Sequence, residues 1–186
     1  MSDDNVASAT AETGNAVPNG APDQEVMQKV AALRAHVRES FGKIALAMMS
    51  LPRYRHQTLA DMQHLILDPL IRDRVAIAYP ANSENDPTSD ISGVAIWASL
   101  SEEADSRLRD QIKSRTWPVR LKAEDWNSGD IAWLIDVIAP TQKETGSVVA
   151  NFRSVVKDGE LRLHPVVGQL LDTETLEKLG MKRGGK

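Results

Sequence analysis

Cysteine is absent from this chain of 186 residues. That excludes a disulfide framework, a thiolate zinc site and a cysteine nucleophile. Aromatic residues are scarce, at 4%, so the positions of the four Trp are informative. Long apolar runs are also missing. None approaches the roughly 20 residues that a membrane-spanning helix needs, and we expect no stable membrane insertion.

Excess positive charge is lacking too. The formal net charge is -4 at pH 7, whereas a nucleic-acid-binding domain usually carries a basic face, so we expect no nucleic-acid partner. The sequence contains no glycine-rich phosphate loop, and its histidines lack metal-ligand spacing, so we expect no metal. The acidic N-terminus does not resemble a signal peptide, and the absence of cysteine fits an intracellular protein. We therefore expect a cytoplasmic location.

The composition along the chain predicts three parts. Residues 1–22 offer almost nothing to bury and are expected to form a disordered tail. Residues 23–180 carry the periodic apolar patterns of one domain with a hydrophobic core. Residues 181–186 are Lys, Arg and Gly and are expected to be a flexible tail.

Apolar residues at steps of three and four predict an amphipathic helix from Asp23, its expected cap, to about Met49. Thr58 and Asp61 predict a capping-box-like start of a second helix, which the later Pro69 breaks or restarts. Ser101 caps a third helix, which ends at about residue 114. Residues 142–156 and 173–179 are further helical candidates.

Strands are predicted at residues 75–79 and 93–99, which form a hairpin with a long loop, and at residues 126–139. Residues 117–121 are expected to be a short extended piece, and residues 161–163 an edge strand. Because helices come first and strands pair mainly as neighbours, the class is α+β. The predicted architecture is a mixed, mainly antiparallel sheet flanked by helices.

Asp136 interrupts a strand that is otherwise apolar on both faces. Strict alternation of side chains places it on the face of Leu134 and Ile138, opposite Trp133 and Val137. A carboxylate in such a strand must be paired, hydrogen-bonded or neutralised, because an isolated buried charge is very costly. Two interpretations stay open: a structural aspartate, bonded to backbone amides or an arginine, or a catalytic one.

His56 is the histidine that best suits catalysis, since it lies in a Pro- and Arg-flanked loop at a predicted helix start, near Tyr54. A histidine paired with a carboxylate commonly takes a proton from a weak nucleophile near neutral pH. The spacing does not show whether His56 meets Asp136, and a structural or merely exposed histidine is the alternative. Likewise, Trp97 is either a core residue or part of a substrate site.

Three successive segments of the sequence together resemble the RTX toxin-activating lysine acyltransferases, the haemolysin-activating family. They are Trp97–Glu103, Asp125–Asp130 and Trp133–Pro140, and both their order and their spacing fit. The resemblance extends back through Leu51–Arg55 and Leu67–Leu70. Each piece alone is weak, and their combination is specific.

The resemblance, which covers roughly residues 40–140, implies a fold similar to that of the GNAT acetyltransferases. It also implies transfer of a fatty acyl chain from acyl carrier protein to an internal lysine of an RTX-type protoxin. No further cofactor would be needed, and the enzyme would form a homodimer. The family's essential aspartate falls on Asp136. Ser128, Gly129 and Asp130, in the turn before this strand, and Trp97 are the expected substrate-binding residues.

The family's essential histidine falls on Tyr54, and His56 comes two residues later. We favour His56 as the base, because an unperturbed phenol has a pKa of about 10. Tyr54 in place of the imidazole is the alternative. Two other functions stay open: a non-catalytic chaperone of a secreted repeat protein, and a small-molecule N-acyltransferase using coenzyme A. The absence of an Arg-x-x-Gly-x-Gly pyrophosphate motif disfavours the latter.

Overall fold

The structure is a computed structural model, and it describes residues 23–80, 90–155 and 161–178. The expected terminal tails and most of the loop after the first strand lie outside these residues. The chain divides into two compact units, residues 1–34 and 35–186. The site lies in the second unit.

The elements follow the chain as helices, a hairpin, and then alternating helices and strands. They are α1 (Gln24–Met49), the 3₁₀ helix η1 (Pro52–Tyr54), the π-helix η2 (Gln63–Leu67), α2 (Asp68–Leu70), β1 (Val75–Ala78), β2 (Gly93–Leu100), α3 (Glu102–Lys113), β3 (Ile131–Ile138), α4 (Gln142–Val155), β4 (Arg162–Leu163), α5 (Pro165–Leu170) and α6 (Thr173–Lys178).

Most predicted elements are present, and the expected caps hold two of the helix starts. Thr58 and Asp61 exchange hydrogen bonds, with the Thr58 amide 2.8 Å from an Asp61 carboxylate oxygen. The Ser101 hydroxyl accepts from the Ala104 amide at the start of α3. The second predicted helix restarts at Pro69, since the π-helix η2 ends at Leu67 and α2 begins at Asp68 with Pro69 in its first turn. A π-turn of this kind is one way for a helix to absorb a local misfit.

The four strands form one sheet in the order β1-β2-β3-β4. The pairs β1–β2 and β2–β3 are antiparallel, and the short β4 runs parallel to β3 at the edge. This confirms the α+β class, the hairpin and the mixed, mainly antiparallel sheet. The likeness to the GNAT acetyltransferases stays a prediction.

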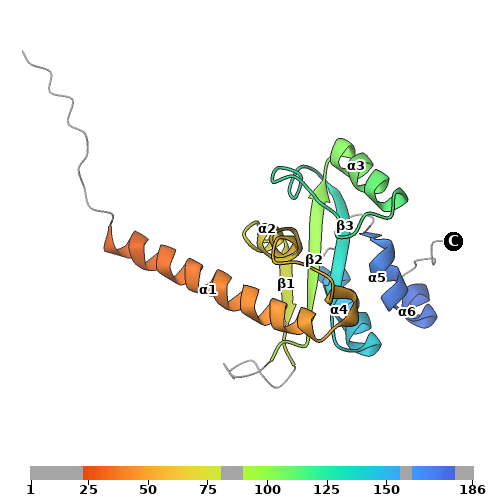
Figure 1. Cartoon of the computed structure of the whole chain (residues 1–186), viewed down its shortest axis with the longest axis horizontal. Coiled ribbons are helices and arrows are strands. Elements are labelled where there is room, and N and C mark those ends of the chain that lie inside the picture. The colour runs from red at the N-terminus through yellow and green to blue at the C-terminus, as the bar shows by residue number, and fades with distance from the viewer. Residues whose placement is uncertain (1–22, 81–89, 156–160, 179–186) are drawn as a thin grey trace, which may run out of the picture. The chain divides into compact units, whose positions relative to one another are not determined.

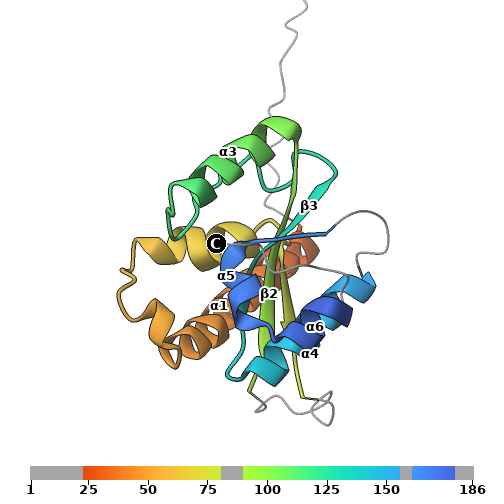
Figure 2. The same cartoon turned by 90° about the vertical axis from the view of Figure 1, so that its right-hand side faces the viewer.

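Helices cover both faces of the sheet (Figures 1 and 2). One face packs against the C-terminal half of α1, η2 and α3, with Ile44, Ile66 and Leu108 fully buried. The other face packs against α4, α5 and α6, with Val149 and Val167 fully buried. Each such side chain contributes roughly 1.5–3 kcal/mol on leaving water. We call these the first and the second face.

A β-bulge in β3 changes which way its side chains point. Ile96 on β2 pairs with Asp136, but the next residue, Trp97, pairs with Leu134. Ile135 is therefore the extra residue on β3. A bulge of this kind bends a strand and interrupts its alternation. Asp136 consequently lies opposite Ile96, on the first face of the sheet.

One expectation from the sequence was therefore wrong, and one helix was not predicted. Asp136 does not share a face with Leu134, because the bulge moves it to the face of Trp133 and Ile135. The short extended piece expected at residues 117–121 lies outside the strands of the sheet. The helix α5 was not predicted, because its six residues are too few to show a helical period. It begins at Pro165, a residue favoured in the first helical turn.

Candidate functional site

The Asp136 carboxylate is 2% exposed and lies against the loop that follows α1. The Tyr54 hydroxyl, at the end of η1, donates a hydrogen bond of 2.5 Å to Oδ2 of Asp136. Oδ1 accepts from the Val137 amide at 2.8 Å and lies 3.1 Å from Nη2 of Arg53. Both oxygens of Asp136 are thus engaged by the chain itself. Oδ2 is engaged by the Tyr54 hydroxyl, and Oδ1 by a backbone amide and an arginine as in the structural interpretation.

Arg53 closes this network. Its Nη2 donates to the Tyr54 hydroxyl at 2.6 Å and to the Val137 carbonyl. Its guanidinium also lies over the Tyr54 ring, 4.6 Å from the centroid. The remaining nitrogens, Nε and Nη1, are buried without a hydrogen-bond partner among the described residues. The positive charge of Arg53 is therefore balanced mainly by Asp136.

Burial controls the protonation of this pair. Burial raises the pKa of Asp136, while Arg53, the Tyr54 hydroxyl and the Val137 amide act in the opposite direction without cancelling it. The pKa of Tyr54 is raised well above its ordinary value, first by burial and then by the charge of Asp136. Tyr54 therefore stays protonated near neutral pH. It acts as a hydrogen-bond donor to Asp136.

His56 lies two residues beyond Tyr54 on the same loop, but it is exposed. Its Nε2 lies 2.9 Å from Nε of Arg55, which donates to it. The structure thus brings Tyr54, not His56, into contact with Asp136. The role of His56 as the base stays a prediction.

The turn before β3 is fixed to the junction of β2 and α3. The Ser128 hydroxyl accepts from the Ser101 amide at 2.8 Å, and the amides of Ser128 and Gly129 both donate to the Ser99 carbonyl. A Cβ on Gly129 would lie 2.7 Å from the Leu100 carbonyl oxygen and 2.8 Å from Cα of Ser101. Only glycine fits so close to another backbone. These contacts explain Ser128 and Gly129 structurally, and their role in substrate binding stays a prediction.

The two other expected substrate residues are separated from Asp136. Asp130 is exposed just before β3. Trp97 packs on the second face with Phe152, their ring centroids 5.8 Å apart, and the Arg74 guanidinium lies 4.2 Å from its ring centroid. Trp97 and Asp136 therefore occupy opposite faces of the sheet.

A second buried aspartate, Asp105 on α3, was missed in the sequence. Its Oδ1 accepts from the Trp133 indole at 2.7 Å and from Arg162 at 2.6 Å. Its Oδ2 lies 2.8 Å from Nη2 of Arg109. Burial opposes ionisation here, but the hydrogen bonds from Trp133, Arg162 and Arg109 outweigh it and lower the pKa of Asp105. The only local signal was Arg109 four residues after Asp105, the spacing of an ion pair on a helix.

The described residues contain neither a metal-binding cluster nor a membrane-spanning helix. No three His, Asp or Glu side chains there lie in an arrangement that could hold a metal ion. No helix in those ranges has the length and apolar character to span a bilayer.

The fold and the site define an α+β protein with a buried Asp-Tyr-Arg network at a bulge of its central antiparallel strand. The sequence model of the RTX toxin acyltransferase family matches residues 33–166, more than half of the chain. The chain therefore belongs to the RTX toxin acyltransferase family, and its activity class is acyl transfer. No curated protein matches the chain.

Proposed function

We propose that the chain transfers a fatty acyl group from acyl carrier protein to an internal lysine of an RTX-type protoxin, in the cytoplasm. The family match carries this proposal, because it includes both Asp136 and the loop from Leu51 to Gln57. The protoxin acceptor follows from the role of the family. We further infer that acyl carrier protein is the donor and that a lysine is the acceptor.

In this proposal Asp136 acts through the loop. The carboxylate, Tyr54 and Arg53 hold η1 against β3, and this fixes the start of the exposed segment that carries His56. The raised pKa of Tyr54 favours its role as a hydrogen-bond donor over that of a base. The imidazole is the side chain that most readily exchanges a proton near pH 7. His56 is therefore the base, and Asp136 is a positioning residue.

The reaction needs no oxidant or further co-reactant. Arg55 moves off Nε2 of His56, and the imidazole takes a proton from the lysine ammonium of the protoxin. The free amine attacks the thioester carbonyl carbon, so that a C–N bond forms and the C–S bond breaks. The imidazolium returns its proton to the leaving thiolate of the carrier's pantetheine arm, and the second proton that the nitrogen loses on becoming an amide passes to water.

The test is an in vitro transfer assay with acyl carrier protein loaded with a fatty acid and an RTX-type protoxin, read by intact mass. His56→Ala should lower the transfer rate by roughly 10²–10⁴-fold, the usual contribution of a general base. Arg55→Ala is the matched control. It removes the neighbour that occupies Nε2 and should retain transfer.

The same assay separates the two residues of the loop. If His56→Ala transfers at the native rate while folded Tyr54→Phe is inactive, the assignment of the base to His56 is wrong and Tyr54 carries the reaction. If Asp136→Asn folds and transfers normally, Asp136 has no positioning role.

A second function is favoured by one observation. Both oxygens of Asp136 are occupied within the chain, and the residue is almost fully buried. A member of the family with such a closed site would bind its repeat-protein partner as a chaperone without acylating it. Co-expression distinguishes the two: an added fatty-acyl mass on the partner supports the enzyme, and a stable complex without that mass supports the chaperone.

A further inference from the structure

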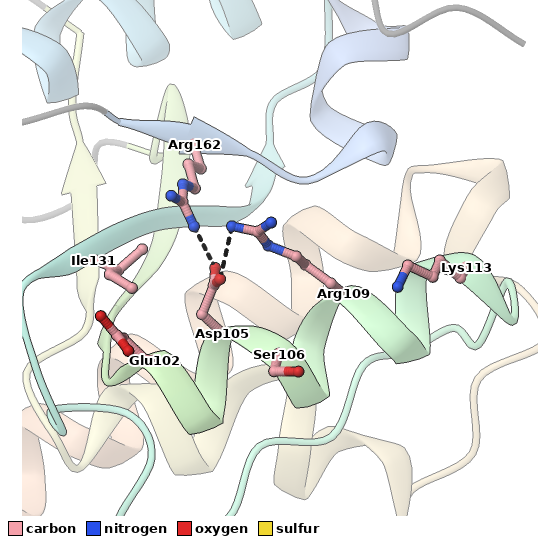
Figure 3. A pocket seen from close by; sticks show the side chains of 7 residues that line it. All are labelled: Glu102, Asp105, Ser106, Arg109, Lys113, Ile131 and Arg162. Atoms are coloured by element: carbon pink, nitrogen blue, oxygen red, sulfur yellow. Dashed lines mark hydrogen bonds and ion pairs between the residues drawn. The ribbon is translucent and has the colours of Figure 1, made fainter.

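A cavity of about 410 Å³ lies along α3 beside the start of β3, away from the Asp136 network. It has the size of a small-molecule site. Its walls come from three elements (Figure 3): α3 supplies Glu102, Asp105, Ser106, Arg109 and Lys113, β3 supplies Ile131, and β4 supplies Arg162.

Two arginines of this cavity are held in place by one buried carboxylate. Arg109 and Arg162 come from different elements and converge on Asp105 (Figure 3). Asp105 is itself fixed by the Trp133 indole, and its lowered pKa keeps it ionised near neutral pH. The guanidinium groups are therefore positioned before any ligand arrives, which reduces the entropy that binding would cost.

The cavity has more positive than negative groups, in a chain that is negative overall. Its cations are Arg109, Lys113 and Arg162, and its anions are Asp105 and Glu102. Each arginine contacts Asp105 through a single nitrogen, and their side chains are 49% and 28% exposed. Further N–H donors of both guanidinium groups are thus available, and the Lys113 ammonium, which lies 3.2 Å from Oδ1 of Asp110, also lines the cavity.

This set of hydrogen-bond donors is better suited to binding a phosphate than to binding a single carboxylate. A guanidinium presents paired donors that match the oxygens of a phosphate, and an ammonium adds a mobile point charge. Three cations from two elements can engage several oxygens of one phosphorus centre. The reaction proposed above brings one such group to the protein, the phosphate that joins the pantetheine arm to its carrier.

We propose that the cavity between α3, β3 and β4 binds the phosphate at the base of the donor's pantetheine arm. The inference rests on the proposed function and adds a donor site to it. Arg109 and Arg162 bind the phosphate oxygens, Lys113 supplies a third, mobile charge, and Asp105 positions both arginines without touching the ligand.

Binding is tested by calorimetric titration of the intact protein with 4′-phosphopantetheine and with pantetheine, which lacks the phosphate. The phosphorylated compound should bind more tightly, and Arg109→Gln and Lys113→Gln should each weaken it about tenfold, the loss of one charge-assisted contact. Lys113 is highly exposed, so its variant tests the site even if Arg109→Gln disturbs folding.

Arg107→Gln is the matched control. Arg107 lies on the same helix, is 45% exposed, and pairs at 2.6 Å with the buried Asp125, but it does not line the cavity. Its variant should bind 4′-phosphopantetheine as the native protein does. Equal losses in Arg107→Gln and Arg109→Gln, or equal affinity for the two compounds, would overturn the proposal. Inorganic phosphate binding as tightly as 4′-phosphopantetheine would show a free-phosphate site and also overturn it.

Transfer kinetics provide an independent test. With acyl carrier protein as donor, Lys113→Gln should raise KM about tenfold and leave kcat unchanged, whereas acyl-pantetheine should be used equally by both forms. An unchanged KM for the carrier donor would refute the site while leaving the proposed function intact. If no donor supports transfer but the binding pattern holds, the proposed function fails and the site stands.

Discussion

Asp136 and Asp105 are both buried, and both act on the first face of β3, but they are held in different ways. Asp136 is on the strand and binds one arginine, one tyrosine and a backbone amide. Asp105 lies on α3, reaches the strand through Trp133, and binds two arginines that are partly open to solvent. One site is closed around its carboxylate, and the other borders a cavity.

The different settings shift the two acids in opposite directions. Burial raises the pKa of Asp136, because one arginine does not offset complete removal from water. The pKa of Asp105 is lowered, because two arginines and an indole outweigh burial. A buried carboxylate beside an arginine therefore does not by itself have a raised or a lowered pKa. The number of hydrogen-bond donors and their access to water decide the direction of the pKa shift.

Truncating the closed site should have the largest effect on stability. Asp136→Ala leaves the Arg53 charge and the Tyr54 hydroxyl without their partner, and should cost about 3–5 kcal/mol of unfolding free energy, as expected for a broken buried pair. Asp105→Ala should cost about 1–3 kcal/mol, because Arg109 and Arg162 can be rehydrated. Urea denaturation of the two variants measures both. Equal losses would remove the distinction between the sites.

The pH dependence of stability should separate the same two residues. The raised pKa of Asp136 means that its contribution is fully present below about pH 4, the ordinary range of Asp, and is lost as the pH rises through the folded value. The lowered pKa of Asp105 has the opposite consequence. Its contribution is present above about pH 4 and is lost as the pH falls below that value.

The measurement is urea denaturation from pH 3 to 8 with Asp136→Asn and Asp105→Asn. The difference in free energy of unfolding between the native protein and Asp136→Asn should shrink as the pH rises. The same difference between the native protein and Asp105→Asn should shrink as the pH falls. Slopes of the same sign for both variants would contradict the assigned shifts.

The closed site around Asp136 could be predicted from the sequence, but its geometry could not. Asp136 was evident because a charge stood in an apolar strand. Its face was predicted wrongly, since the extra residue Ile135 depends on pairing with β2, and pairing is not local information. Its partner was also uncertain, because Tyr54 and His56 are two residues apart and only the 3₁₀ turn of η1 decides which of them points inward.

The second site, around Asp105, was not predicted from the sequence, for a different reason. Asp105 follows Glu102 and Glu103 in the first turn of α3, where acidic residues are expected to face solvent and favour the helix dipole. Its partners Trp133 and Arg162 are distant in sequence, so only the packing of α3 against β3 and β4 unites them. The helices and the hairpin were predictable because periodicity and caps are local, whereas long-range pairing was not.

His56 provides the smallest expected effect on stability and the sharpest contrast with Asp136. Its ring is exposed and bonded only to the equally exposed Arg55 among the described residues. His56→Ala should therefore change the free energy of unfolding by less than about 0.5 kcal/mol, as for most surface substitutions. Urea denaturation beside the transfer assay then separates stability from activity: a base at His56 requires lost transfer in a protein of native stability. A large loss of stability would instead show that His56 belongs to the packed loop.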